Sequence, residues 1–108
     1  MMNGLNMKDI LKKAKEMQDN LAQKKEDAAK KTVDVSVGGG MVKMVMNGNF
    51  ETVSIKIDPE IVDKEDVEIL EDLVRAAINE SDKQAKELVS TELSQTLHGL
   101  NLSDLTNF

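Results

Sequence analysis

Apolar and polar residues alternate through the middle of the chain, and this pattern predicts strands. Residues 32–37 have a valine at every second position, and residues 42–46 and 53–57 repeat the alternation. A period of two turns one side of each strand toward a core and the other toward solvent. The sequence therefore predicts three strands that share one apolar face, with the side chains of Lys43 and Lys56 on the other.

Glycine and asparagine residues separate these strands and predict tight turns between them. Asn47-Gly48 lies between the second and third strands, and we expect Gly48 to supply the positive φ of a hairpin turn. The glycines at 38–40 reverse the chain between the first two strands. A glycine-rich loop can also cradle phosphate, but a helix follows that device, whereas a strand follows here. We therefore expect a three-stranded antiparallel meander over residues 32–57.

Helical spacing flanks the strands on both sides. Residues 5–31 contain no glycine or proline, and their apolar residues recur at intervals of three and four, which predicts a helix with a narrow apolar seam. A second helix is predicted from about 63 to 98, with Asp63 as its N-cap and a wide apolar stripe in its first half. Together these elements predict an α+β fold in the order helix, three strands, helix. We expect a single domain over residues 1–108, with a short mobile tail at 99–108.

Apolar side chains from the strands and the second helix should form the core. The expected core residues are Val35, Val37, Val42, Met44, Val53, Ile55, Ile57, Leu70, Leu73, Val74 and Ile78. One three-stranded sheet and two narrow-seamed helices leave apolar surface that a single chain cannot cover. We therefore expect a homodimer.

Composition excludes several kinds of site. There is no cysteine, and the one histidine has no serine and carboxylate at a recognisable spacing, so we expect no enzyme and no cofactor. The carboxylates of residues 60–72 suit the positive end of a helix dipole better than a metal site, so we expect no metal. Without a signal peptide or a membrane-length apolar run, we expect a cytoplasmic protein with no membrane partner.

The charged residues are unevenly distributed. The net charge is −6, yet residues 1–48 carry 9 basic and 6 acidic side chains, and residues 49–108 carry 5 and 14. This asymmetry leaves room for a basic surface on an acidic protein. Because the chain has two phenylalanines and no tryptophan or tyrosine, it lacks the aromatic surface on which readers of single strands stack bases. The composition therefore argues against a protein that reads single strands or RNA loops.

Four segments fit the pattern of one known family. They are GGGMVK at 38–43, NG at 47–48, VSIKIDP at 53–59 and EDLVRAAIN at 71–79. In these segments the chain resembles the YbaB/EbfC family of nucleoid-associated DNA-binding proteins. That resemblance implies a cytoplasmic homodimer associated with the nucleoid. It also implies that the sheets form a body from which the long helices project as DNA-binding arms.

Two functional hypotheses follow from the pattern and the resemblance. The first is a dimer that binds duplex DNA through lysine contacts to phosphate and contributes to chromosome organisation and gene regulation. The alternative is a dimeric adaptor for a protein partner, for example one of DNA repair or recombination, with weak or incidental DNA affinity. The candidate DNA-binding residues are Lys8, Lys12, Lys15, Lys24, Lys25, Lys30, Lys31, Lys83 and Lys86.

Overall fold

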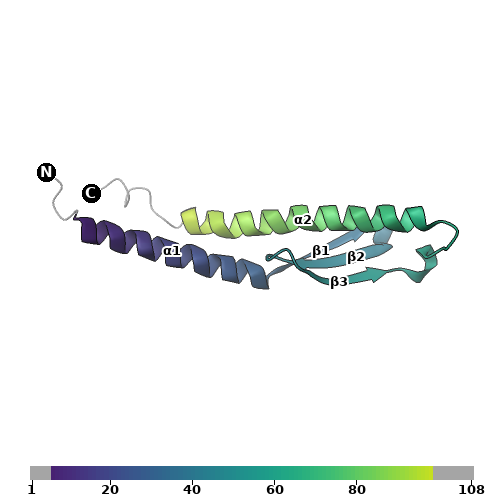
Figure 1. Cartoon of the computed structure of the whole chain (residues 1–108), viewed down its shortest axis with the longest axis horizontal. Helices are drawn as coiled ribbons and strands as arrows, with labels where there is room; N and C mark the ends of the chain where they lie inside the picture. The colour runs from purple at the N-terminus through teal and green to yellow at the C-terminus, as the bar shows by residue number, and fades with distance from the viewer. Residues whose placement is uncertain (1–5, 99–108) are drawn as a thin grey trace.

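The fold consists of two long helices and a three-stranded antiparallel sheet (Figure 1). The computed structural model describes residues 6–98, so the tail expected at 99–108 lies outside the described residues. The elements are α1 (Met7–Lys30), β1 (Thr32–Val37), β2 (Val42–Asn47), β3 (Thr52–Ile57) and α2 (Val67–His98), with 3₁₀ turns at Gly38–Gly40 and Pro59–Ile61. This order confirms the predicted α+β fold.

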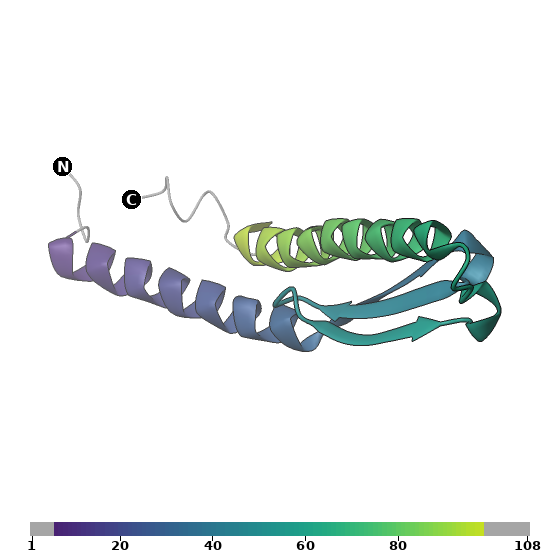
Figure 2. The same cartoon turned by 45° about the vertical axis from the view of Figure 1, so that its right-hand side comes forward.

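The molecule is elongated, and part of α1 projects from it. Its principal extents are 77, 18 and 16 Å. The helix α2 runs along the sheet and then beside the end of α1, whereas the first half of α1 continues beyond the end of α2 in both views (Figures 1 and 2). Every residue from 7 to 16 is exposed. We refer to residues 7–16 as the arm.

The sheet has one apolar face, and α2 covers part of it. Strand order is β1-β2-β3, and the register places Val35 opposite Met44, which in turn lies opposite Ile55. The helix α2 contacts β1 and β2 but makes few contacts with β3. The buried cluster between α2 and the sheet contains Val42, Met44, Met46, Ile61, Ala77 and Ala85.

Three residues expected in the core are instead exposed. The exposed fractions are 57% for Val53, 43% for Ile55 and 45% for Ile78. The strand β3 is an edge strand that α2 does not cover, and Val53 is the extra residue of a bulge, because Thr52 pairs with Met46 and Ser54 with Val45. Ile78 follows the fully buried Ala77, so its side chain points about 100° away around the helix.

Most of the other expected core residues pack in or against the core. Val35, Val42 and Met44 are buried. Val37, Ile57, Leu70 and Leu73 are half-buried and pack against the core cluster. Val74 is half-buried but is not among the residues that pack against this cluster. Sequence analysis did not place Ala28, Ala77 or Ala85 in the core, yet each is almost completely buried. Small side chains at these points let the helices approach their neighbours closely, which hydrophobic spacing alone does not reveal.

The hairpin between β2 and β3 forms as predicted, but its strained residue is not Gly48. The only non-glycine residue with positive φ in the described chain is Phe50, at 62°, and Gly48 has no positive φ. The Phe50 N–H donates to the Asn47 carbonyl oxygen, and the Asn47 N–H donates to the Glu51 carbonyl oxygen, both at 3.0 Å. This is a three-residue hairpin loop, in which the left-handed position is the last of the three.

Asn47 holds this loop together through its side chain. Its Oδ1 atom accepts hydrogen bonds from the backbone N–H groups of Asn49, at 2.9 Å, and Glu51, at 3.0 Å. The side-chain amides of Asn47 and then Asn49 donate to the Glu51 carboxylate, and these hydrogen bonds lower the pKa of Glu51. Local hydrogen bonds therefore offset the cost of a left-handed phenylalanine.

Gly48 is needed for a close approach to α1 instead. It is buried, and its N–H donates to the Lys31 carbonyl oxygen at 3.1 Å. A Cβ atom at this position would overlap the Ala28 carbonyl group, 2.6 Å from its carbon. The hairpin loop thus packs directly on the last turn of α1.

The second helix begins later than predicted, at Val67 rather than at 63. Asp63 makes a separate turn: its side chain accepts a hydrogen bond from the Glu65 N–H at 2.9 Å, and its carbonyl accepts one from the Asp66 N–H at 3.0 Å. The predicted N-cap therefore caps a turn just before the helix. The predicted and observed helices share the same end, His98.

Candidate nucleic-acid interface

Three candidate lysines lie on the arm. Lys8, Lys12 and Lys15 are exposed and spaced by four and three residues, so they share one side of α1. Their Cα atoms span about 10 Å of the helix axis at 1.5 Å per residue. Asn6 caps this helix, because its Oδ1 atom accepts a hydrogen bond from the Asp9 N–H at 2.9 Å. The lysines therefore project from a capped, regular helix.

Three more candidates lie where α1 meets the sheet. Lys24 is half-buried, whereas Lys25 and Lys30 are exposed. This end of α1 is fixed, since Ala28 is buried and the hairpin loop packs on it. The structure therefore places these lysines on the body of the molecule, separate from the arm.

Lys31 forms an ion pair within the chain. Its Nζ atom contacts a carboxylate oxygen of Glu92 on α2, 61 residues further along the sequence. The Glu92 side chain is only 7% exposed, whereas that of Lys31 is 54% exposed. A nearly buried carboxylate needs a compensating charge, and Lys31 supplies one. This contact joins the end of α1 to α2 and gives Lys31 a structural task.

We expect Lys31→Gln to reduce the free energy of unfolding by more than it reduces the free energy of DNA binding. Losing a hydrogen bond to a charged group costs about 1.5–3 kcal/mol. Because the Lys31 side chain is partly exposed and water screens its charge, we expect a loss near the lower value. Thermal unfolding followed by circular dichroism would measure the loss. Lys30→Gln, at an exposed neighbour, is the matched control and should leave the melting temperature nearly unchanged. Equal melting temperatures for the two variants would contradict the structural role.

The two candidates on α2 lie beside the sheet. Lys83 lines a hollow of about 370 Å³ with Val33 of β1 and the carboxylates Glu80 and Glu87. Lys86 forms an ion pair with Asp82 at 2.7 Å. Each positive charge therefore has acidic neighbours on the same helix. The structure does not bring Lys83 or Lys86 together with the arm lysines.

The outer face of the sheet carries two lysines that were not among the candidates. Lys43 and Lys56 are exposed and lie directly opposite each other on β2 and β3. Strand alternation had placed both on this face. Their position across from each other depends on the pairing register, which includes a bulge near the turn. The sequence pattern does not give this register, so it could not show that the two lysines lie opposite each other.

The described residues contain neither a metal-binding cluster nor a membrane-spanning helix. Among residues 6–98, no group of three or more histidine, cysteine or acidic side chains is arranged to hold a metal ion. Neither described helix has a stretch that is both long enough and apolar enough to cross a membrane.

The chain matches one protein family over nearly its whole length. Residues 2–100 match the YbaB/EbfC DNA-binding family. A nucleoid-associated protein of Thermoanaerobacter sp. (strain X514) is 46% identical over 102 residues, which cover 94% of this chain and 92% of the relative. A nucleoid-associated protein of Desulfotalea psychrophila is 41% identical over 104 residues, which cover 96% of this chain and 98% of the relative.

A solved structure has the same fold. The crystal structure of an uncharacterized protein from Helicobacter pylori superposes with a TM-score of 0.74 and covers 86% of this chain and 98% of its own. Its sequence identity to this chain is 24%, so the likeness concerns the fold alone.

Proposed function

Because this chain belongs to the YbaB/EbfC DNA-binding family, we propose that it binds duplex DNA as a homodimer and contributes to chromosome organisation and gene regulation. The observation that carries the proposal is the family match over residues 2–100. The names of the relatives support association with the nucleoid, and hence a cytoplasmic location. The family is a DNA-binding one, so catalysis is no part of the proposal.

The arm supports a mode of binding based on phosphate contacts. Lysine ammonium groups at positions 8, 12 and 15 project into solvent from one side of a helix. The sequence has one arginine, Arg75, which forms an ion pair with Asp72 at 2.8 Å, so arginine reading of guanine is not the main device in this proposal. Phosphate contacts carry no base information, so we expect little sequence preference.

Fluorescence anisotropy with a labelled duplex over a series of salt concentrations tests the proposal. Binding that weakens steeply with salt, and similarly for unrelated sequences, is the expected result. A complete lack of salt-sensitive binding at low ionic strength would overturn it. In that case the adaptor hypothesis would take over, and a defined protein partner would have to be sought by pull-down from lysate.

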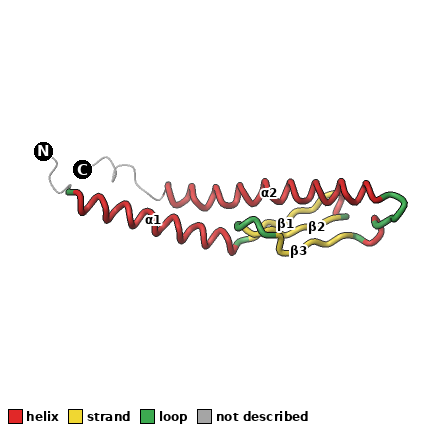
Figure 3. The backbone as a smooth tube through the Cα atoms, in the orientation of Figure 1, coloured by secondary structure: helices red, strands yellow, loops and turns green. Residues whose placement is uncertain are grey.

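Exposed apolar surface supports the homodimer. Val53 and Ile55 belong to the edge strand β3, whose inward face α2 leaves largely uncovered (Figure 3). Ile78 on α2 is exposed as well. Exposed apolar side chains next to a core are typical of protein interfaces, and a second copy with the same surface would bury both by two-fold symmetry.

We expect Ile55→Glu to convert the dimer into monomers at micromolar concentration, because it would bury a charge at the interface. Ser54→Glu is the matched control: it adds the same charge one residue away, on the opposite face of β3, and should remain a dimer. Light scattering after gel filtration measures both. A monomeric unmodified chain would contradict the homodimer, and a dimeric Ile55→Glu variant would move the interface away from β3.

A further inference from the structure

The outer face of the sheet has a basic row that crosses all three strands. Ser36 of β1 pairs with Lys43 of β2, and Lys43 pairs with Lys56 of β3. Residues paired directly across strands share a face, with Cβ atoms about 5 Å apart. We refer to Ser36, Lys43 and Lys56 as the sheet row. All three side chains are exposed.

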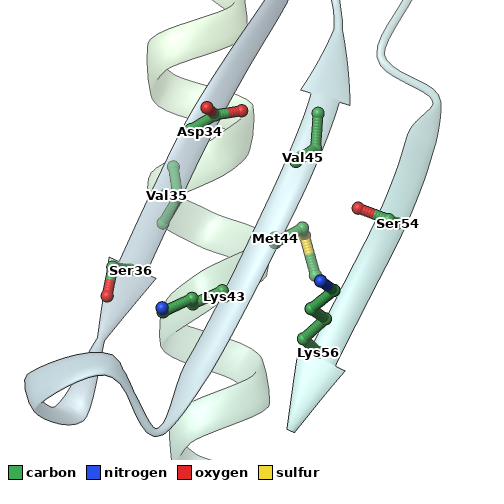
Figure 4. Close-up of a pocket in the computed structure, with 8 residues that line it drawn as sticks. All are labelled: Asp34, Val35, Ser36, Lys43, Met44, Val45, Ser54 and Lys56. Atoms are coloured by element: carbon green, nitrogen blue, oxygen red, sulfur yellow. The ribbon is translucent and has the colours of Figure 1, made fainter.

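This row borders a shallow hollow. A cavity of about 290 Å³ is lined by the sheet row together with Asp34, Val45 and Ser54, among others. Figure 4 shows the Lys43 amine beside Ser36, and the Lys56 side chain leaning from β3 toward β2. The two ammonium groups therefore flank β2, with the hydroxyls of Ser36 and Ser54 on the neighbouring strands.

The arrangement is unfavourable for the isolated chain. Like charges directly opposite on neighbouring strands destabilise a sheet. Among residues 6–98, neither Lys43 nor Lys56 has an ion-pair partner, even though Asp34 lies on the adjacent row. In the described chain, α2 covers the other face of the sheet and no element covers this one (Figures 1 and 3). A bound anion would relieve the repulsion.

We propose that the sheet row binds the phosphate backbone of duplex DNA, as a second contact surface besides the arm. Lysine ammonium groups and serine hydroxyls are both donors that commonly contact DNA phosphates. Two lysines on neighbouring strands, with their ammonium groups on the two sides of β2, can contact consecutive phosphates of a DNA strand. The proposal rests on the proposed DNA-binding function and assigns it a surface on the body of the molecule.

Charge and shape favour DNA over the other anions that this chemistry would accept. The hollow lies on the outer face of the sheet, which no described element covers (Figure 3), so an extended ligand can reach both lysines. A duplex presents a line of phosphates that can meet both lysines at once. Asp34 repels an anion from the adjacent row, which confines the contact to Ser36, Lys43 and Lys56.

The first test is the double variant Lys43→Gln/Lys56→Gln. Removing two phosphate contacts from each chain of the proposed homodimer, four in all, should reduce the magnitude of the slope of log affinity against log salt by about 3.6, and lower duplex affinity at 0.1 M salt on the order of a thousandfold. The melting temperature should stay the same or rise, because the like-charge pair is gone. Lys43→Arg/Lys56→Arg keeps both charges and should retain the salt slope.

The second test maps the contact directly. The chain has no cysteine, so Ser54→Cys can carry a single iron-chelate cleavage reagent on the outer face. It should cut a bound duplex, whereas the same reagent on Asn79→Cys, exposed on α2, should cut much less. Inorganic phosphate at matched ionic strength should compete no better than chloride.

The outcomes separate this proposal from the function on which it rests. If the unmodified chain shows no salt-sensitive DNA binding, the proposed function fails. If it binds DNA, but the double glutamine variant keeps its affinity and slope and Ser54→Cys does not cut, only the sheet row fails. Tight, saturable competition by inorganic phosphate would point to a free anion, and binding of an acidic protein alone would point to a protein partner. Either result would overturn the assignment to DNA.

Discussion

Replacing Gly48 with valine should lower the free energy of unfolding by more than about 3 kcal/mol, a large share of the stability of a small domain. A Cβ atom at Gly48 would overlap the Ala28 carbonyl group, and relief requires the hairpin loop to move away from α1. That movement would also break the hydrogen bond from the Gly48 N–H to the Lys31 carbonyl. Urea unfolding followed by circular dichroism measures the effect.

Gly48→Ala separates this explanation from a requirement for positive φ. At an ordinary φ with free space, glycine to alanine commonly stabilises a protein by about 0.4–1 kcal/mol. Here alanine carries the same clashing Cβ atom, so it should also destabilise. Thr52→Val is the control at an exposed position of β3 and should be nearly neutral. A stabilising Gly48→Ala would show that the loop does not pack on α1 as described.

The hairpin illustrates how far sequence patterns reach in this chain. The alternation of Val42, Met44 and Met46 with polar residues, followed by Asn-Gly, was sufficient to predict the paired strands. The residue with positive φ could not be predicted in the same way. It is Phe50, because the side chain of Asn47 holds a three-residue loop, and Gly48 is instead required by a helix that is distant in sequence.

Which of the predicted core residues are buried also depends on tertiary geometry. Ile55 and Met44 have the same alternation and lie opposite each other, yet Met44 is 3% exposed and Ile55 is 43% exposed. The difference arises because α2 lies over β1 and β2 and not over β3. No local pattern encodes how many strands one helix covers. The exposed residues of β3 are those on which the homodimer proposal rests.

For the charged residues of the candidate site, too, the sequence reveals local spacing but not tertiary contacts. Helical winding was enough to group Lys8, Lys12 and Lys15 on one side of α1. The sequence did not indicate that Lys31 would pair with Glu92, since 61 residues separate them. Nor did it indicate that Lys86 would form an ion pair with Asp82 four residues before it, because a lysine at that spacing can also stay unpaired.

The triple variant Lys8→Gln/Lys12→Gln/Lys15→Gln should lose most of the salt-dependent DNA binding that the arms supply. Each lysine contact with phosphate contributes a slope of about −0.9 in log affinity against log salt. Two or three contacts on each arm of a dimer give roughly −4 to −5. Their removal should lower duplex affinity at 0.1 M salt by at least about a hundredfold, for all sequences alike.

The same variant should keep its dimer and its melting temperature, because residues 7–16 are exposed and contribute little to the core. Lys8→Arg/Lys12→Arg/Lys15→Arg should preserve the slope, and Lys64→Gln, beyond the far end of the sheet, should leave it unchanged. Anisotropy over a salt series, with light scattering on each sample, measures all of these. An intact dimer that keeps its DNA affinity and its salt slope would show that these three arm lysines do not contact phosphate. The phosphate contacts would then have to lie elsewhere: near the sheet at Lys24, Lys25, Lys30 and Lys31, on α2 at Lys83 and Lys86, or at the sheet row.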